Sequence, residues 1–148
     1  MGISVISIDP GITTGYCRAL VDNKGCAVRP YQAKNDVWQH WDELKAYHPD
    51  IIIIEDFEYR KGQRDGLILF SVQLIGVTRL WAKQNNATLY IQKAMEGKSH
   101  FSNELLKDRG VYKRGMPHAM DATRHLIHWF TFKAGYQYVK PDDPIELL

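Results

Sequence analysis

Two carboxylates follow apolar segments that read as buried strands. Asp9 ends the run of residues 3–8, and Glu55 follows four consecutive isoleucines at positions 51–54. An ionised carboxylate at the end of a buried strand is costly unless a metal ion or a partner group compensates its charge. Because successive strand residues alternate between faces, only one of Glu55 and Asp56 should share a face with Asp9.

An imidazole and a third carboxylate lie near the other end of the chain. His118 and Asp121 are three residues apart in what reads as the first turns of a helix, so their side chains can converge. Together with Asp9 and Glu55 they form a plausible site for divalent cations. Carboxylates suit hard cations such as Mg²⁺ or Mn²⁺, whereas a zinc site would favour more Cys and His.

Each of these features also has a simpler interpretation. The turn at residues 9–15 could be only a capped turn, or it could cradle a phosphate as the first phosphate loop of actin-like ATPases does. Glu55 could simply be a polar residue where the chain leaves the strand, and Asp121 could pair with His125 on a helix surface. We assign His125 and His128 structural roles. An actin-like ATPase needs two such domains, for which 148 residues are too few. A non-catalytic nucleic-acid-binding module is disfavoured because the acidic groups would repel phosphate without a metal.

Periodicity and turn signals predict an α/β fold, with a mixed sheet flanked by helices. Three leading strands include a hairpin, and helices then alternate with strands. We expect one domain over residues 1–134 and a loosely packed C-terminal tail over 135–148. The expected strands are 3–9, 16–21, 26–32 (with a turn at Asn23 and Gly25), 51–54 and 88–91. The expected helices are Asn35 or Asp36 to 47 (burying Trp38, Trp41 and Leu44), 66–84, Ser99 or Ser102 to 110, and 117–134.

The segment 66–84 is apolar on more than one helical face. One stripe contains Leu69, Val72 and Ile75, and another contains Phe70, Leu74 and Val77. A small domain has too few elements to cover every face of such a helix. We therefore expect one stripe to face the sheet and the other a second copy of the chain.

Composition favours one cellular compartment but does not identify a binding partner. The net charge is +2, so any basic patch must be local. No apolar run reaches transmembrane length, and no signal peptide is evident. Cys17 and Cys26 would not sit opposite each other across the hairpin turn, so we expect reduced thiols and a cytoplasmic protein.

Basic and aromatic residues cluster where they could flank the carboxylates at one end of the sheet. Such clusters are typical of phosphate contacts to nucleic acid, although solvated basic loops are the simpler alternative. The candidates for DNA binding are Phe57, Tyr59, Arg60, Lys61, Arg64, Lys93, Lys98, Lys113 and Arg114.

The order of these motifs resembles the RuvC family of Holliday junction resolvases, within the RNase H-like nuclease superfamily. The similar segments are Ile8-Asp9-Pro10-Gly11 with Thr14-Gly15, then Ile54-Glu55 with Phe57, Gln73-Leu74-Ile75-Gly76, and His118-Ala119-Met120-Asp121-Ala122. The resemblance covers about residues 3–130, and matches only loosely between residues 55 and 73 and over residues 93–114.

This resemblance implies an RNase H-like fold and an endonuclease that resolves four-way DNA junctions. It also implies a homodimer and two Mg²⁺ (or Mn²⁺) ions per site, held by Asp9, Glu55, His118 and Asp121. His118 stands where many members have Asp and some have His. The resemblance also favours Glu55 over Asp56 as the metal ligand. Another RNase H-like nuclease, acting on other branched DNA or on RNA–DNA hybrids, would share every one of these residues.

Overall fold

The structure is a computed structural model that describes residues 2–58, 61–62, 65–134 and 145–147. Its strands are β1 (Ile3–Asp9), β2 (Thr13–Asp22), β3 (Gly25–Lys34), β4 (Ile51–Glu55), β5 (Thr88–Gln92) and β6 (Ile145–Leu147). Its helices are α1 (Val37–Tyr47), α2 (Asp65–Gln84), α3 (Ala94–Lys98), α4 (Asn103–Asp108) and α5 (Pro117–Phe132).

These strands form one mixed sheet with the order β5-β4-β1-β2-β3-β6. The first three strands are antiparallel neighbours, and β4 and β5 run parallel to β1. The hairpin register places Val21 opposite Cys26 and Asp22 opposite Gly25, as the turn signals predicted. Cys17 lies opposite Pro30, so the two cysteines are not cross-strand partners, and both are free. The α/β fold with a mixed sheet, predicted from the sequence, is therefore confirmed.

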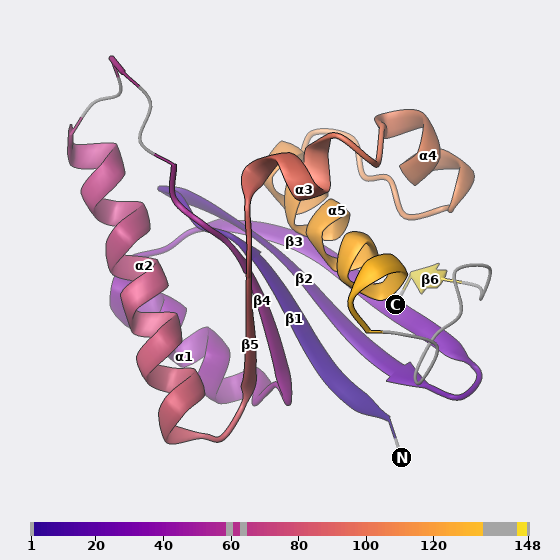
Figure 1. The fold of residues 1–148 in the computed structure, drawn as a ribbon, viewed down its shortest axis with the longest axis horizontal. Coiled ribbons are helices and arrows are strands. Elements are labelled where there is room, and N and C mark those ends of the chain that lie inside the picture. The colour runs from indigo at the N-terminus through magenta and orange to yellow at the C-terminus, as the bar shows by residue number, and fades with distance from the viewer. Residues whose placement is uncertain (1, 59–60, 63–64, 135–144, 148) are drawn as a thin grey trace.

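Helices cover both faces of the sheet (Figure 1). The α1 and α2 helices lie on one face, and α5 lies on the other with α3 and α4 beside it. Strand alternation divides the core accordingly: Ile52 and Ile54 pack in the cluster beneath α1 and α2, whereas Ile51 and Ile53 pack against α5. The four isoleucines are buried, as a central strand covered on both faces requires.

The α5 helix approaches the sheet closely at β2. A Cβ atom on Gly15 would lie 1.9 Å from the backbone oxygen of His118, so only glycine permits this contact. Gln32 on β3 then accepts from the first backbone N–H groups of the helix, those of His118 (3.2 Å) and Ala119 (3.3 Å). Such N–H groups have no partner within the helix. The two contacts fix where α5 begins relative to the sheet.

The structure corrects several local expectations. On α1, Leu44 is buried and Trp41 packs partly against the core, as predicted, but Trp38 is 75% exposed. The second fully buried residue of this helix is His40, four residues before Leu44. The last-but-one helix is capped by Ser102, not Ser99, and the short α3 helix precedes it. In the tail, where we expected no strand, Ile145–Leu147 pairs with β3.

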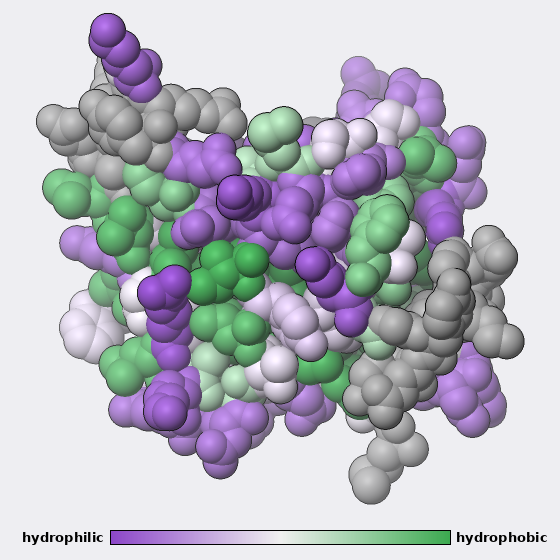
Figure 2. Space-filling view, in the orientation of Figure 1, coloured by the Kyte–Doolittle hydropathy of each residue, from purple (hydrophilic) through white to green (hydrophobic). Residues whose placement is uncertain are grey.

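The α2 helix has one buried and one outward face. Leu74, Ile75 and Trp81 are buried. The predicted stripe of Leu69, Val72 and Ile75 therefore does not lie on one face, because Ile75 is buried while Leu69 and Val72 are exposed. The outward face carries exposed Leu69, Val72 and Leu80, and Figure 2 shows hydrophobic side chains gathered over this helix on the left. No helix in the described part of the chain is long and apolar enough to cross a membrane.

Candidate active site

Three parallel strands deliver polar side chains to one edge of the sheet. Asp9 ends β1, Glu55 ends β4 and Gln92 ends β5, and Glu55 and Gln92 are register partners. Alternation from Ile53 places Glu55 on the face that α5 covers. Asp56, next along the chain, accepts from the backbone N–H of Phe57 instead. Figure 2 shows hydrophilic residues at the top, where β1, β4 and β5 end.

Asp9 and His118 face each other across the junction of β1 and α5. Asp9 is 8% exposed, and its Oδ2 lies 3.1 Å from Nδ1 of His118. Burial raises the pKa of Asp9, and the nearby carboxylates of Glu55 and Asp121 raise it further against the opposing hydrogen bond from His118. That hydrogen bond raises the pKa of His118. Asp9 is thus a buried acid in a field of other acids, which favours a cation beside it.

Glu55 is held by a residue that the sequence analysis left in a structural role. Its Oε2 lies 2.9 Å from Nε2 of His125, whose Nδ1 lies 2.7 Å from Oε1 of Gln92. His125 is 0% exposed. The spacing of Asp121 and His125 suggested a surface pair between them, but the imidazole turns to the sheet. Only the packing of α5 on β4 and β5 reveals this contact.

Asp121 is paired with two cationic side chains. Its Oδ1 accepts from Arg124 at 2.8 Å, and its Oδ2 lies 3.4 Å from Nζ of Lys98. Lys98 also lies 3.9 Å from Oε1 of Glu55. Burial works against the charged form of Lys98, but Glu55 and Asp121 outweigh it and raise its pKa. Arg124 further donates to the backbone oxygen of Phe101 and so ties α5 to the segment before α4.

The four predicted ligands therefore lie around one edge of the sheet, but they do not form a closed cage. Within the described part of the chain, no three His, Cys, Asp or Glu side chains are arranged to hold a metal ion. The carboxylates instead face His118, His125, Arg124 and Lys98. The donor set still fits a hard divalent cation, because hard oxygen ligands dominate it and Asp9 is buried among like charges.

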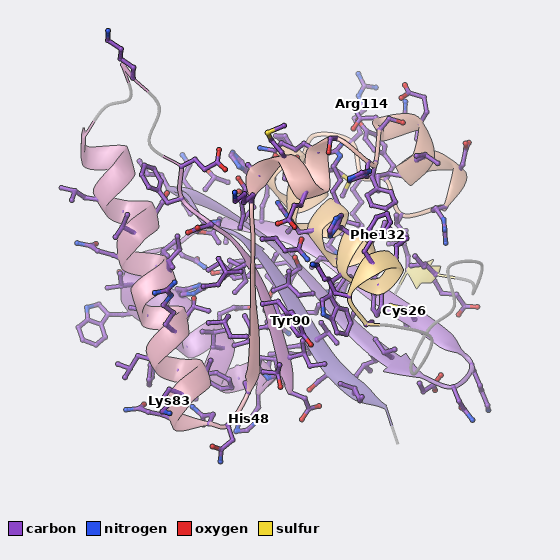
Figure 3. All side chains as sticks on the ribbon, viewed as in Figure 1. Cys26, His48, Lys83, Tyr90, Arg114 and Phe132 are labelled. Carbon is purple, nitrogen blue, oxygen red and sulfur yellow. The ribbon has the colours of Figure 1, made fainter. Side chains whose placement is uncertain are left out.

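The predicted DNA-binding residues that the structure describes have different surroundings. Lys98 is in the site itself, Lys93 precedes α3 and is exposed, and Phe57 packs partly into the core beneath α2. Lys113 reaches the backbone oxygen of Pro30 at 3.4 Å, and Arg114 is exposed near α4 (Figure 3). Lys61 is exposed; Tyr59, Arg60 and Arg64 lie outside the described residues.

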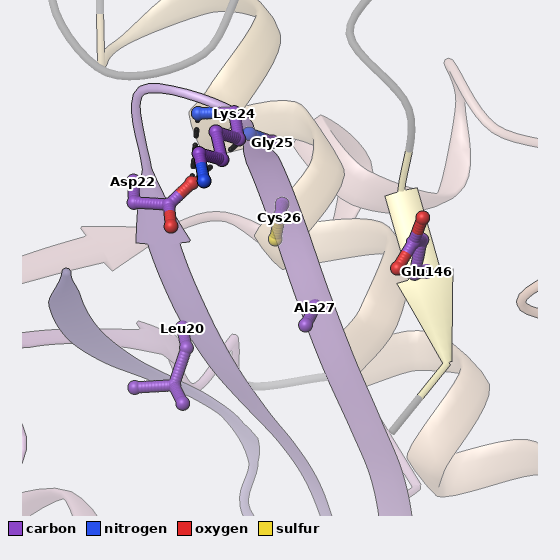
Figure 4. A pocket seen from close by; sticks show the side chains of 7 residues that line it. All are labelled: Leu20, Asp22, Lys24, Gly25, Cys26, Ala27 and Glu146. Atoms are coloured by element: carbon purple, nitrogen blue, oxygen red, sulfur yellow. Dashed lines mark hydrogen bonds between the residues drawn. The ribbon is translucent and has the colours of Figure 1, made fainter.

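Hollows lined by described residues lie beside the sheet. One, of about 270 Å³, is lined by Lys113, Met116, Asp121 and Arg124 among others, and so adjoins the site at Asp121. The other, of about 420 Å³, lies between the hairpin and β6 and is lined by Leu20, Asp22, Lys24, Gly25, Cys26, Ala27 and Glu146 (Figure 4). Leu20 pairs with Ser4 at the start of β1, so this second hollow is at the opposite end of the sheet from Asp9.

Comparison with known proteins identifies the fold. No protein-family profile matches the chain, and no curated protein matches it by sequence. Solved structures do match: Thermus thermophilus RuvC in complex with Holliday junction substrate has a TM-score of 0.62 and 17% identity, covering 82% of this chain and 89% of that one. A second Thermus thermophilus RuvC structure gives 0.60 and 18%, covering 85% and 94%. The yeast mitochondrial Holliday junction resolvase Ydc2 gives 0.61 and 17%, covering 84% and 76%. The chain therefore has the RNase H-like fold in the form found in RuvC and Ydc2.

Proposed function

We propose that this chain is a divalent-metal-dependent endonuclease that resolves four-way DNA junctions. The observation that carries the proposal is the set of Asp9, Glu55, His118 and Asp121 around one edge of a sheet whose fold matches junction resolvases. One of those matches is a complex with Holliday junction substrate. Asp9 is coupled electrostatically to both other carboxylates, which a merely capped turn would not require.

In this proposal, Asp9, Glu55, Asp121 and His118 would together hold two Mg²⁺ or Mn²⁺ ions, with Asp9 as the central ligand. Bound there, the ions would activate the attacking water and stabilise the leaving 3′-oxygen of the cut strand. The residues themselves supply the negative charge and the fixed positions. Asp9 is rigid because it is buried on β1, and His118 is held at the start of α5 by Gln32.

Lys98 has a separate role in the proposed site. Its ammonium group lies between Glu55 and Asp121, where it offsets part of their charge. Its side chain is 46% exposed, so it can move toward a DNA phosphate when another cation occupies the site. The other predicted contacts, at Lys61, Lys113 and Arg114, would hold the flanking phosphates.

Cleavage of a panel of substrates tests this function. The protein should cut a labelled four-way junction in the presence of Mg²⁺ or Mn²⁺, and cut plain duplex, a Y-shaped fork and an RNA–DNA hybrid far more slowly. Equal cleavage of the RNA–DNA hybrid would favour the second candidate, a general RNase H-like nuclease. Failure to cut any substrate with either metal would refute both.

We also propose a homodimer, because symmetric cleavage of a junction needs two sites. The outward face of α2, with Leu69, Val72 and Leu80 exposed, is the proposed interface. The double variant V72E/L80E should be a folded monomer that nicks junctions without paired cuts, as judged by sedimentation and product analysis. A wild-type protein that sediments as a monomer even when bound to a junction would contradict the dimer.

A further inference from the structure

We infer that His125 is a positioning residue, which orients Glu55 as a metal ligand. The inference rests on the proposed function, because it assigns Glu55 to the metal site. Nothing in the sequence pattern distinguishes this histidine from a core residue, but its contacts do.

Three contacts from three different elements fix the imidazole of His125. Its Nε2 lies 2.9 Å from Oε2 of Glu55 on β4, and its Nδ1 lies 2.7 Å from the side-chain amide of Gln92 on β5. The face of the ring packs against Gly97 of α3, where an added Cβ would lie 3.1 Å from Cε1 and from Nδ1. A ring held on both edges and on one face has a single orientation.

The hydrogen-bond chemistry determines what this ring does to Glu55. A carboxylate can only accept, so the Nε2–H of His125 donates to it. The Nδ1 atom then needs a donor, and the structure places Oε1 of Gln92 against it. Exchanging the two ends of the Gln92 amide puts its Nε2–H toward the ring and supplies that donor. That orientation also gives a partner to the Gln92 amide nitrogen, which otherwise has none among the described residues.

This arrangement selects which oxygen of Glu55 lies toward Lys98 and Asp121. The imidazole takes Oε2, while Oε1 points toward Lys98 at 3.9 Å, which in turn reaches Asp121. A purely space-filling core residue would not need to donate to a carboxylate at the site edge. Partners of this kind orient metal ligands, and losing one typically costs metal affinity.

The test compares two variants of nearly equal shape at this buried position. His125→Met removes the donor to Glu55, and His125→Gln replaces it with an amide N–H at the distance of Nε2. His128→Gln is the matched control, since His128 is also buried on α5 but contacts Phe132 and His100 rather than the carboxylates. Binding of Mn²⁺ alone is measured by calorimetry without DNA, together with the melting temperature and junction binding in EDTA.

We expect His125→Met to weaken Mn²⁺ binding by about 10- to 100-fold, with His125→Gln recovering most of the affinity. His128→Gln should bind Mn²⁺ like the wild type. Junction binding in EDTA should be unchanged in all three, and cleavage by His125→Met should recover at high Mn²⁺. If His125→Met does not fold, Gln92→Met decides, with a smaller loss of Mn²⁺ affinity expected.

Two results would refute different parts of the proposal, and the experiment distinguishes them. Wild-type affinity for Mn²⁺ in His125→Met, or in Gln92→Met where that variant decides, would overturn the positioning role and leave the proposed function standing. A wild-type protein that binds no Mn²⁺ and cuts no junction would overturn the proposed function itself.

Discussion

Replacing Gly15 with alanine should push α5 away from the sheet. The site should be disturbed as a result, because α5 carries two of its residues, His118 and Asp121. The added Cβ would lie 1.9 Å from the His118 oxygen and 2.8 Å from the Ala119 nitrogen. Ordinary contact begins at 3.4 Å, so the two backbones must move apart by 3.4 − 1.9 = 1.5 Å. Both partners are backbone atoms, and no side chain can rotate away to relieve the clash.

The expected cost follows from that displacement. Overpacking a well-filled contact costs about 1–3 kcal/mol, and a backbone clash belongs at the upper end. For a chain of this size, a loss of about 3 kcal/mol lowers the melting temperature by roughly 6–12 °C. Because α5 carries His118 and Asp121, a shift of more than 1 Å should also lower junction cleavage by about 100-fold.

Calorimetry measures the change in melting temperature. Single-turnover cleavage, at a temperature where both proteins are folded, measures the change in rate. Gly76→Ala is the matched control for the melting temperature, since an added Cβ there meets nothing within 4 Å in the same chain. It should be neutral, or more stable by up to about 1 kcal/mol. If Gly15→Ala has the melting temperature and the cleavage rate of the wild type, the close approach of α5 to β2 does not position the site.

Three further predictions concern the ligand, the DNA contacts and the pH dependence of stability. Glu55→Gln should abolish metal-dependent cleavage while Asp56→Asn spares it, and the reverse result would mean that the ligand is the neighbouring residue. Replacing Lys61 and Arg64 with alanine should weaken junction binding and make the slope of log K against log salt shallower by about two units at most; an unchanged slope would remove both contacts. Burial lowers the pKa of His40 to about 4, so the unfolded chain binds more protons between pH 6.5 and 4. Acidification over that range should therefore reduce the free energy of unfolding by up to about 3 kcal/mol more in the wild type than in His40→Gln, and parallel pH profiles in denaturant melts would contradict this.

The features predictable from the sequence were those set by local pattern. The Asn23 and Gly25 turn gave the hairpin register, and the isoleucine run gave a central strand ending at Glu55. The ligand set came from motif order, and the structure gathers its members around one edge, although whether they bind metal stays a prediction.

The features that sequence reasoning missed depend on tertiary packing. His125 is an ordinary core histidine until α5 lies across the ends of β4 and β5. Trp38 was predicted to be buried with Leu44, yet α1 turns His40 inward beside Leu44 and leaves Trp38 exposed. The pairing of residues 145–147 with β3 is a long-range contact with no local signal in a tail rich in Pro and Asp.

Asp9 is the residue on which the proposed chemistry depends most, and one paired measurement on it tests the account directly. Wild-type protein and Asp9→Asn are each incubated with a labelled four-way junction and Mg²⁺, and binding and cleavage are measured in the same samples. The variant should bind the junction at least as tightly, because it removes a negative charge from the DNA-facing edge, and it should not cleave. Metal-dependent cleavage by Asp9→Asn within about tenfold of the wild type, a loss of under about 1.4 kcal/mol in transition-state stabilisation, would contradict the account.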